Sequence, residues 1–144
     1  MPTITNTIAI KANPDEVWRV LSDMPGTRYW LPGVVAADMA GDVRICRMAD
    51  GEDVHEQISD VAPDRRSYRF EHLRVPLPVR QSGGSFAVTA GPDPGTATVT
   101  LTTTFEPLDP TGADQLTGMI HGVFQQSLES LRRFVEDALP WDAD

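Results

Sequence analysis

The stretch VHEQI, at residues 54–58, places a carboxylate among apolar side chains. If it forms a β-strand, Val54, Glu56 and Ile58 point to one face, because side chains alternate between the two faces of a strand. An unpartnered carboxylate on an apolar face is costly. Burial would raise the pKa of Glu56 and an arginine partner would lower it. Arg44, on the preceding predicted strand, is the candidate partner.

A histidine on the next predicted strand is the second group that could move a proton. Tyr68, Phe70 and His72 share one face of the segment SYRFEH, and the apolar members of this set favour the inward side. An interior His72 would titrate near neutral pH and could act as an acid or a base. The alternative is that His72 lies at the strand end and faces solvent.

Two sulfur-containing side chains and an aromatic pair extend the candidate site. Cys46 and Met48 alternate with Arg44 and therefore share its face. A buried cysteine is usually inert packing, and no base is placed to activate Cys46. Tyr29 and Trp30 bury large areas while offering a polar tip, which suits the end of a cavity.

The sequence lacks the patterns of metal sites, of phosphate- or dinucleotide-binding loops and of the Gly-x-Ser-x-Gly nucleophile motif. The three histidines, at positions 55, 72 and 121, and the one cysteine do not have metal-ligand spacing. SGGSF matches neither a Walker loop nor a dinucleotide-binding loop, and no Gly-x-Ser-x-Gly motif occurs. We therefore expect neither a metal nor a cofactor.

Composition limits the class of protein. The chain has 144 residues and a formal net charge of -9. This suits one domain over residues 1–144 and disfavours nucleic acid and anionic lipid as partners. No run approaches the ~20 apolar residues of a membrane span, and the N-terminus lacks the features of a secretory signal. A single cysteine fits a reducing cytoplasm.

The elements that would position these side chains follow from hydrophobic periodicity. Residues 3–10 alternate as a strand. Asn13 as N-cap and Pro14 at the first position begin a helix of about two turns, and a second short helix falls around residues 25–30. From 34 to 105, short alternating runs separated by turn residues predict an antiparallel meander. Its breaks are expected at 41–42, 50–51, 63–64, 76–78, 83–84 and 92–95.

The last segment has a different period. Apolar residues recur at threes and fours from about 111 to 139, and Pro140 ends the run, so one long helix is predicted. Thr117 and Ser127 fall near its apolar face, where a small hydroxyl bonds either its own backbone or a ligand; both interpretations stay open. The apolar positions are Leu116, Ile120, Phe124, Leu128, Leu131 and Val135.

Together these elements predict an α+β fold. A curved seven-stranded antiparallel sheet wraps around the long C-terminal helix, and two short helices follow the first strand. Such a sheet and a single helix leave space between them, so a cavity of about 300–1,000 Å³ is expected. Glu56 would then face this cavity. The alternative is a salt bridge at the rim of the sheet with no ligand role.

The order of elements and several motifs resemble the helix-grip (SRPBCC) superfamily. It contains plant pollen allergens, lipid-transfer START domains, abscisic-acid receptors and bacterial polyketide cyclases/dehydrases. The closest likeness is to the polyketide cyclase/dehydrase-like branch and covers essentially the whole chain. The motifs are NPDEVWRVLSD (13–23), WLPGV (30–34), GDVR (41–44), ADG (49–51), HEQI (55–58), PDRRSYRF (63–70), PLPV (76–79) and QQSLESLRRFVE (125–136).

The resemblance implies features of a site as well as a fold. It places Glu56 in the pocket and makes residues 48–53 and 74–80 loops over the entrance; a pair of ordinary hairpin turns is the alternative. The hormone receptors carry a lysine where this chain has Trp30, so the resemblance does not extend to an abscisic-acid-like acid ligand.

These observations predict a protein that encloses a small hydrophobic molecule, with a polyketide cyclase/dehydrase-like enzyme as the specific hypothesis. Cyclisation needs a held shape, proton transfer and a polarised carbonyl. Glu56 or His72 would move the proton, and Arg44 or Tyr68 would polarise the carbonyl. The alternatives are a non-catalytic carrier or sensor of a lipid, quinone or polyketide, and a protein-interaction module like the chaperone-activating relatives. Expected ligand contacts are Tyr29, Trp30, Cys46, Met48, Val54, Ile58, Tyr68, Phe70, Leu77, Thr117, Ile120, Phe124 and Leu128.

Overall fold

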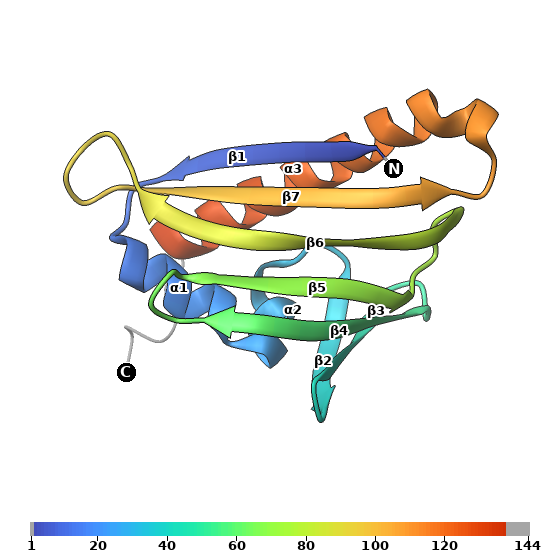
Figure 1. Cartoon of the computed structure of the whole chain (residues 1–144). Helices are drawn as coiled ribbons and strands as arrows, with labels where there is room; N and C mark the ends of the chain where they lie inside the picture. The colour runs from blue at the N-terminus through green and yellow to red at the C-terminus, as the bar shows by residue number, and fades with distance from the viewer. Residues whose placement is uncertain (1, 138–144) are drawn as a thin grey trace.

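The computed structural model describes residues 2–137. Within this range a seven-stranded antiparallel sheet has the strand order β1-β7-β6-β5-β4-β3-β2, and a long helix lies across it (Figure 1). The predicted α+β helix-grip fold is confirmed. The elements are β1 (Thr3–Ile10), α1 (Pro14–Ser22), α2 (Thr27–Trp30), β2 (Val34–Ala40), β3 (Val43–Met48), β4 (Asp53–Ala62), β5 (Ser67–Arg74), β6 (Val79–Ala90), β7 (Ala97–Pro107) and α3 (Ala113–Asp137).

The first strand and the two short helices form where the sequence predicts them. β1 alternates strictly between exposed and buried residues, as a strand with one face on a core does. Asn13 occupies the N-cap position of α1, but its side chain makes no capping hydrogen bond and Nδ2 donates instead to Glu16 Oε1 at 3.4 Å. α2 follows a 3₁₀ turn (Met24–Gly26) and supplies the second short helix.

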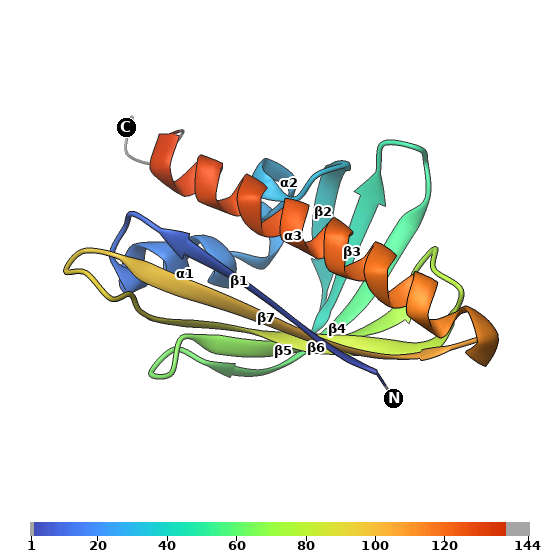
Figure 2. The ribbon, with the colours of Figure 1, turned by 90° about the horizontal axis from the view of Figure 1, so that it is seen from above.

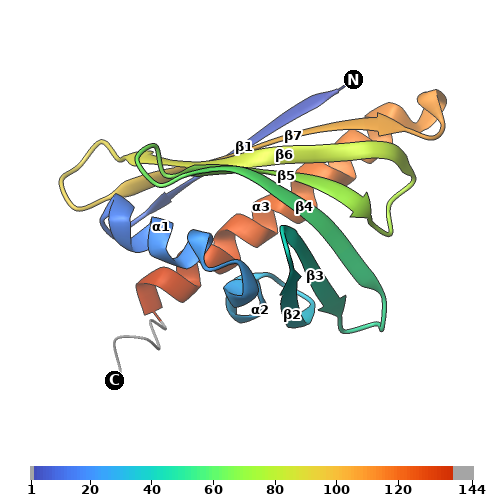
Figure 3. The same ribbon diagram turned by 60° about the horizontal axis from the view of Figure 1, so that its bottom comes forward.

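The sheet is strongly curved, and the curvature keeps part of it away from α3. Figures 2 and 3 show β2 and β3 turning out of the plane of the other strands, toward α2 and α3. The pairing of β4 with β5 shifts register between His55 and Glu56 and again between Ser59 and Ala62. Such irregularities bend a strand and increase its twist. α3 packs on β1 and α2 packs on β2 and α3, which leaves β3–β6 to enclose a space.

The strand break expected at residues 83–84 is wrong, because β6 continues through both glycines. A Cβ at Gly84 would lie 2.1 Å from the carbonyl oxygen of Thr102 on β7, and a Cβ at Gly83 would lie 2.6 Å from that of Phe70 on β5. The glycines therefore let the neighbouring backbones approach β6 closely, which is a second reason for glycine inside a strand.

α3 confirms the predicted long helix. It begins after a 3₁₀ turn (Pro110–Gly112); the end predicted at residues 139–140 lies outside the described residues. Its first half packs Leu116 and Ile120 against Ile4 and Phe105. Its second half joins a larger core with α1 and the strands, and this core buries Trp18 of α1.

Candidate functional site

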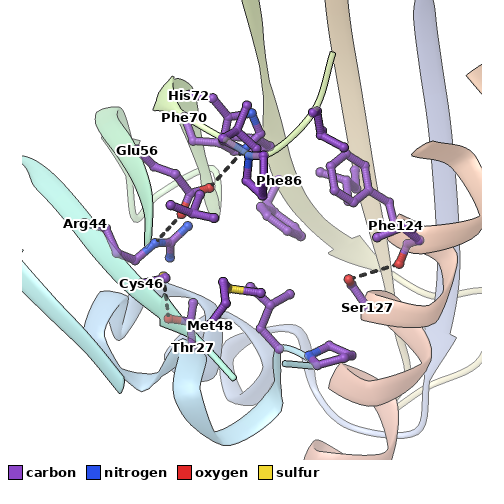
Figure 4. A pocket seen from close by; sticks show the side chains of 18 of the residues that line it. Thr27, Arg44, Cys46, Met48, Glu56, Phe70, His72, Phe86, Phe124 and Ser127 are labelled. Carbon is purple, nitrogen blue, oxygen red and sulfur yellow. Dashed lines mark hydrogen bonds and ion pairs between the residues drawn. The ribbon is translucent and has the colours of Figure 1, made fainter. Parts of the chain in front are cut away.

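A cavity of about 200 Å³ lies between the concave face of the sheet, α2 and α3 (Figure 4). Its wall is mostly apolar. The volume is below the expected range because four aromatic side chains occupy part of the space between sheet and helix: Trp30, Phe70, Phe86 and Phe124. An apolar cavity of this size can take a small organic molecule.

One end of the cavity carries a row of ionisable side chains on three adjacent strands. Arg44 on β3 is the direct cross-strand partner of Glu56 on β4, and Glu56 is the partner of His72 on β5. All three point to the concave face, because they occupy equivalent positions in the pleat. Arg44 Nε donates to Glu56 Oε1 at 2.9 Å, and His72 Nε2 lies 3.4 Å from Glu56 Oε2. The three side chains are 3%, 9% and 7% exposed, so this pair does not lie at an exposed rim.

A serine on the next strand completes the row. His72 Nδ1 and Ser82 Oγ are hydrogen-bonded at 2.7 Å, and Ser82 is buried. The backbone pairing of β5 with β6 ends at Glu71 and Gly83, so this side-chain bond joins the strands just beyond their last backbone pair. A serine hydroxyl can donate or accept. Ser82 can therefore hold the imidazole in either neutral tautomer and in its protonated form.

The charges in the row are fixed by their neighbours. Burial would raise the pKa of Glu56, but hydrogen bonding to His72 and the charge of Arg44 outweigh burial and lower it to about 2. Burial would lower the pKa of Arg44, but its interactions with Tyr68 and Glu56 outweigh burial and raise it above the usual arginine value. Glu56 is therefore a carboxylate at neutral pH, and its charge is balanced by the Arg44 guanidinium.

Cys46 lies beside this row and is not a nucleophile. Burial, followed by the charge of Glu56, raises the pKa of its thiol. The nucleophilic form of cysteine is the thiolate, which this environment disfavours. Sγ lies 3.8 Å from the hydroxyl oxygen of Thr27.

The structure brings most of the predicted site residues together around the cavity. Each lies on one of the strands or helices that enclose it, or in the β5–β6 loop. They are Trp30, Arg44, Cys46, Met48, Val54, Glu56, Phe70, His72, Leu77 and Phe124.

Six predicted ligand contacts lie elsewhere. Tyr29 is 56% exposed and stacks on Phe134 at the surface, because it points away from the cavity-facing side of α2. Ile58, Tyr68 and Leu128 share a face with cavity residues but lie deeper in the packed core. We therefore do not assign these four to the ligand.

The remaining two belong to the first half of α3. The Thr117 hydroxyl donates to the carbonyl oxygen of Ala113 at 2.8 Å, which is the backbone interpretation of a helical threonine. Ile120 packs in the cluster with Leu116. Both positions lie on the predicted helical face, but ahead of the turn that reaches the cavity.

Other wall residues were not predicted as ligand contacts. Phe86 has a signal in the sequence, since it alternates with Val88 on β6, whereas Thr27 and Val75 lie in segments without periodicity. Ser127 lines the cavity, but its hydroxyl also donates to its own helix, to Val123 O at 3.1 Å. Pro32 and Ser127 also line the cavity, and the wall residues that were not anticipated are Thr27, Leu31, Val75, Pro76, Phe86, Leu101 and Val123.

The family model described as "Polyketide cyclase / dehydrase and lipid transport" matches residues 1–136. The chain belongs to this family. The match spans both the row of ionisable residues and α3. No curated protein sequence matches the chain.

Several solved structures share the fold of this chain. The protein XoxI from Bacillus cereus has a TM-score of 0.88 and 23% identity, over 95% of this chain and 97% of that one. The di-domain ARO/CYC BexL from the BE-7585A biosynthetic pathway has a TM-score of 0.83 and 20% identity, over 94% of this chain and 47% of that one. Norcoclaurine synthase from Thalictrum flavum, in complex with dopamine and hydroxybenzaldehyde, has a TM-score of 0.73 and 16% identity, over 95% and 87% of the two chains. At these identities the likeness establishes the fold.

Two structural features bear on the other classes of site. Among residues 2–137, no helix is both long and apolar enough to cross a membrane. In the same part of the chain, no three histidine, cysteine or acidic side chains are grouped closely enough to hold a metal ion.

Proposed function

We propose that this protein encloses a small, largely apolar organic molecule and catalyses a proton-transfer reaction on it, such as a cyclisation or a dehydration. The observation that supports this is the row Arg44–Glu56–His72 inside an otherwise apolar cavity. Membership of the polyketide cyclase/dehydrase and lipid transport family supports the same class of role. Two proteins of the same fold also support it: the di-domain ARO/CYC BexL, and norcoclaurine synthase in its complex with dopamine and hydroxybenzaldehyde.

His72 is the proton-transfer group in this proposal. When Nδ1–H donates to Ser82, the Nε2 lone pair faces the Glu56 carboxylate at 3.4 Å, so Nε2 can take a proton from a ligand that lies between these two groups. Glu56 then stabilises the imidazolium that forms, in the way a carboxylate supports a catalytic histidine. Glu56 itself is a weak base, because its pKa is about 2, and Arg44 keeps its carboxylate in place.

A dehydration shows how protons and electrons balance in such a reaction. His72 removes the proton from a carbon next to a ligand carbonyl, and the C–H electrons form a C=C bond. The C–O bond to the neighbouring hydroxyl breaks, and the leaving oxygen takes the same proton back from His72, so water is released. The row needs no external oxidant or reductant for this step.

The proton-transfer role can be tested with 5-nitrobenzisoxazole, a neutral two-ring probe. Removal of the single C–H proton of its isoxazole ring breaks the N–O bond and releases a coloured cyano-nitrophenolate. We expect the protein to accelerate this reaction and the substitution His72→Phe to reduce the rate by about 10²-fold or more. His121→Phe, at an exposed histidine of α3, is the matched control. A wild-type rate in His72→Phe, or no acceleration over free imidazole, would contradict the proposal.

A carrier is the second candidate, because both ring nitrogens of His72 already have partners within the protein. A carrier would retain its ligand in native mass spectrometry. It would keep full affinity after Glu56→Gln and His72→Phe and show no proton transfer.

We also infer that residues 48–53 and 74–80 control entry of the ligand to the cavity, since Met48 and Leu77 from these segments line the cavity.

A further inference from the structure

We infer that the cavity takes a neutral aromatic molecule of one or two rings that carries a hydroxyl group. The structure points to exclusion of larger ring systems and of ionised acids and amines. This inference rests on the proposed function and narrows its ligand.

The volume sets the size of the ligand. An apolar cavity of about 150 Å³ holds benzene, and drug-sized ligands occupy pockets of about 300–1,000 Å³. The present cavity, at about 200 Å³, falls between these limits. One ring fits with space to spare and two fused rings come close to filling the space.

The wall selects a flat ring. The Trp30 and Phe86 rings lie 6.2 Å apart at an interplanar angle of 87°, and the Phe70 and Phe86 rings lie 5.8 Å apart at 41°. Edge-to-face and offset contacts are the favourable geometries between aromatic rings. Figure 4 shows Phe124 on α3 across the cavity from Glu56. A ring between them would meet aromatic faces and edges on several sides.

The charge balance selects a neutral molecule. The Arg44 guanidinium and the Glu56 carboxylate already neutralise each other, so a charged ligand would add an uncompensated charge to an apolar enclosure. Burying an unpaired charge is strongly unfavourable. An anion could enter only together with a compensating proton.

The polar end selects a hydroxyl. An ionised carboxylate only accepts hydrogen bonds, and each of its oxygens can accept more than one. The 3.4 Å separation of Glu56 Oε2 and His72 Nε2 is longer than a strong charge-assisted hydrogen bond. A ligand hydroxyl can donate to this oxygen while it accepts from the imidazole or the guanidinium, which a carbonyl or an ether cannot do.

Four probes of known structure test the inference by titration calorimetry at about pH 8, where phenols are neutral. They are 2-naphthol, 2-methoxynaphthalene, 2-naphthoate and 1-hydroxypyrene. We expect 2-naphthol to bind most tightly, with each of the others weaker by about tenfold or more. Glu56→Gln should weaken 2-naphthol and leave 2-methoxynaphthalene unchanged. Equal or tighter binding of naphthoate, of the methyl ether or of hydroxypyrene would overturn the ligand class while keeping the proposed cavity function. Failure of all four probes to bind would overturn the proposed function itself.

A gain of binding tests the size limit separately. Phe124→Ala removes a wall side chain, so we expect hydroxypyrene affinity to rise by about tenfold or more. Phe134→Ala, on the same helix but stacked on Tyr29 outside the cavity, should leave it unchanged. Hydroxypyrene binding that is equally weak in both variants, with 2-naphthol still bound, would contradict the size argument.

Discussion

The buried carboxylate predicts a specific loss of stability in acid. The pKa of Glu56 is about 2 in the folded protein, against an ordinary value near 4.5. The folded state therefore holds this proton less tightly than the unfolded chain does. Glu56 contributes stability above about pH 4.5, and that contribution disappears as the pH falls toward 2. Each tenfold change in proton affinity corresponds to about 1.4 kcal/mol, so the loss amounts to about 3 kcal/mol.

The assay is urea unfolding, followed by circular dichroism, of the wild type and Glu56→Gln between about pH 7 and pH 2. At neutral pH we expect the variant to be less stable by about 3–5 kcal/mol, because Arg44 keeps a buried charge without its partner. At about pH 2 the difference should shrink by about 3 kcal/mol. Asp15→Asn is the control, since Asp15 pairs with Arg66 at the surface and is 83% exposed; such pairs contribute about 0–1 kcal/mol. Parallel pH profiles of the wild type and Glu56→Gln would refute the reasoning.

Three further outcomes are expected. Ser82→Ala should lower the free energy of unfolding in urea by about 1–3 kcal/mol, because it leaves a buried imidazole nitrogen unpaired. Ser82→Thr should restore the stability, and Ser127→Ala should lower it by less than about 1 kcal/mol. Equal losses in Ser82→Ala and Ser127→Ala would contradict the special role of Ser82. Cys46 should react slowly with iodoacetamide in the folded protein, because the pKa of its thiol is raised. The reaction should be slower still with 2-naphthol bound and fast in urea. Fast labelling of the folded protein would show an accessible thiolate and contradict this expectation. Gly84→Ala should cost about 3 kcal/mol or more through its clash with β7, whereas Gly118→Ala, on open helix surface, should stabilise by up to about 1 kcal/mol; a neutral Gly84→Ala would contradict the close strand approach.

Periodicity was sufficient for the fold because each element buries one face. β1 and β7 alternate cleanly and α3 repeats at threes and fours, so their types follow directly from the sequence. β6 was harder, since Gly83 and Gly84 are typical of a turn as well as of close strand approach. Only the positions of Phe70 O and Thr102 O distinguish the two.

The site was predictable where it depends on the pleat. Arg44, Glu56 and His72 were expected on one face of consecutive strands, and the register places them side by side. Ser82 could not be paired with His72 in advance, because the loop at 75–78 and the register of β5 with β6 decide which residues meet.

The sequence also could not show which side chains of an inward strand face lie in the packed core and which border the cavity. Ile58 shares a face with Glu56, and Tyr68 shares a face with His72, yet both lie in the packed core. Periodicity assigns a side chain to a face, but the crossing of α3 over the sheet decides which part of that face is filled. The same crossing decides that Phe124 borders the cavity while Leu128, one turn later, is fully buried.

The central claim is that a small aromatic molecule lies between the sheet and α3 with its polar group at Glu56 and His72. A crystal structure of the protein with 2-naphthol bound tests it most directly. We expect the ring between Phe86 and Phe124, and its hydroxyl within hydrogen-bond distance of the Glu56 carboxylate. A cavity filled by side chains, with naphthol on the outer surface and Glu56 turned to solvent, would contradict the account.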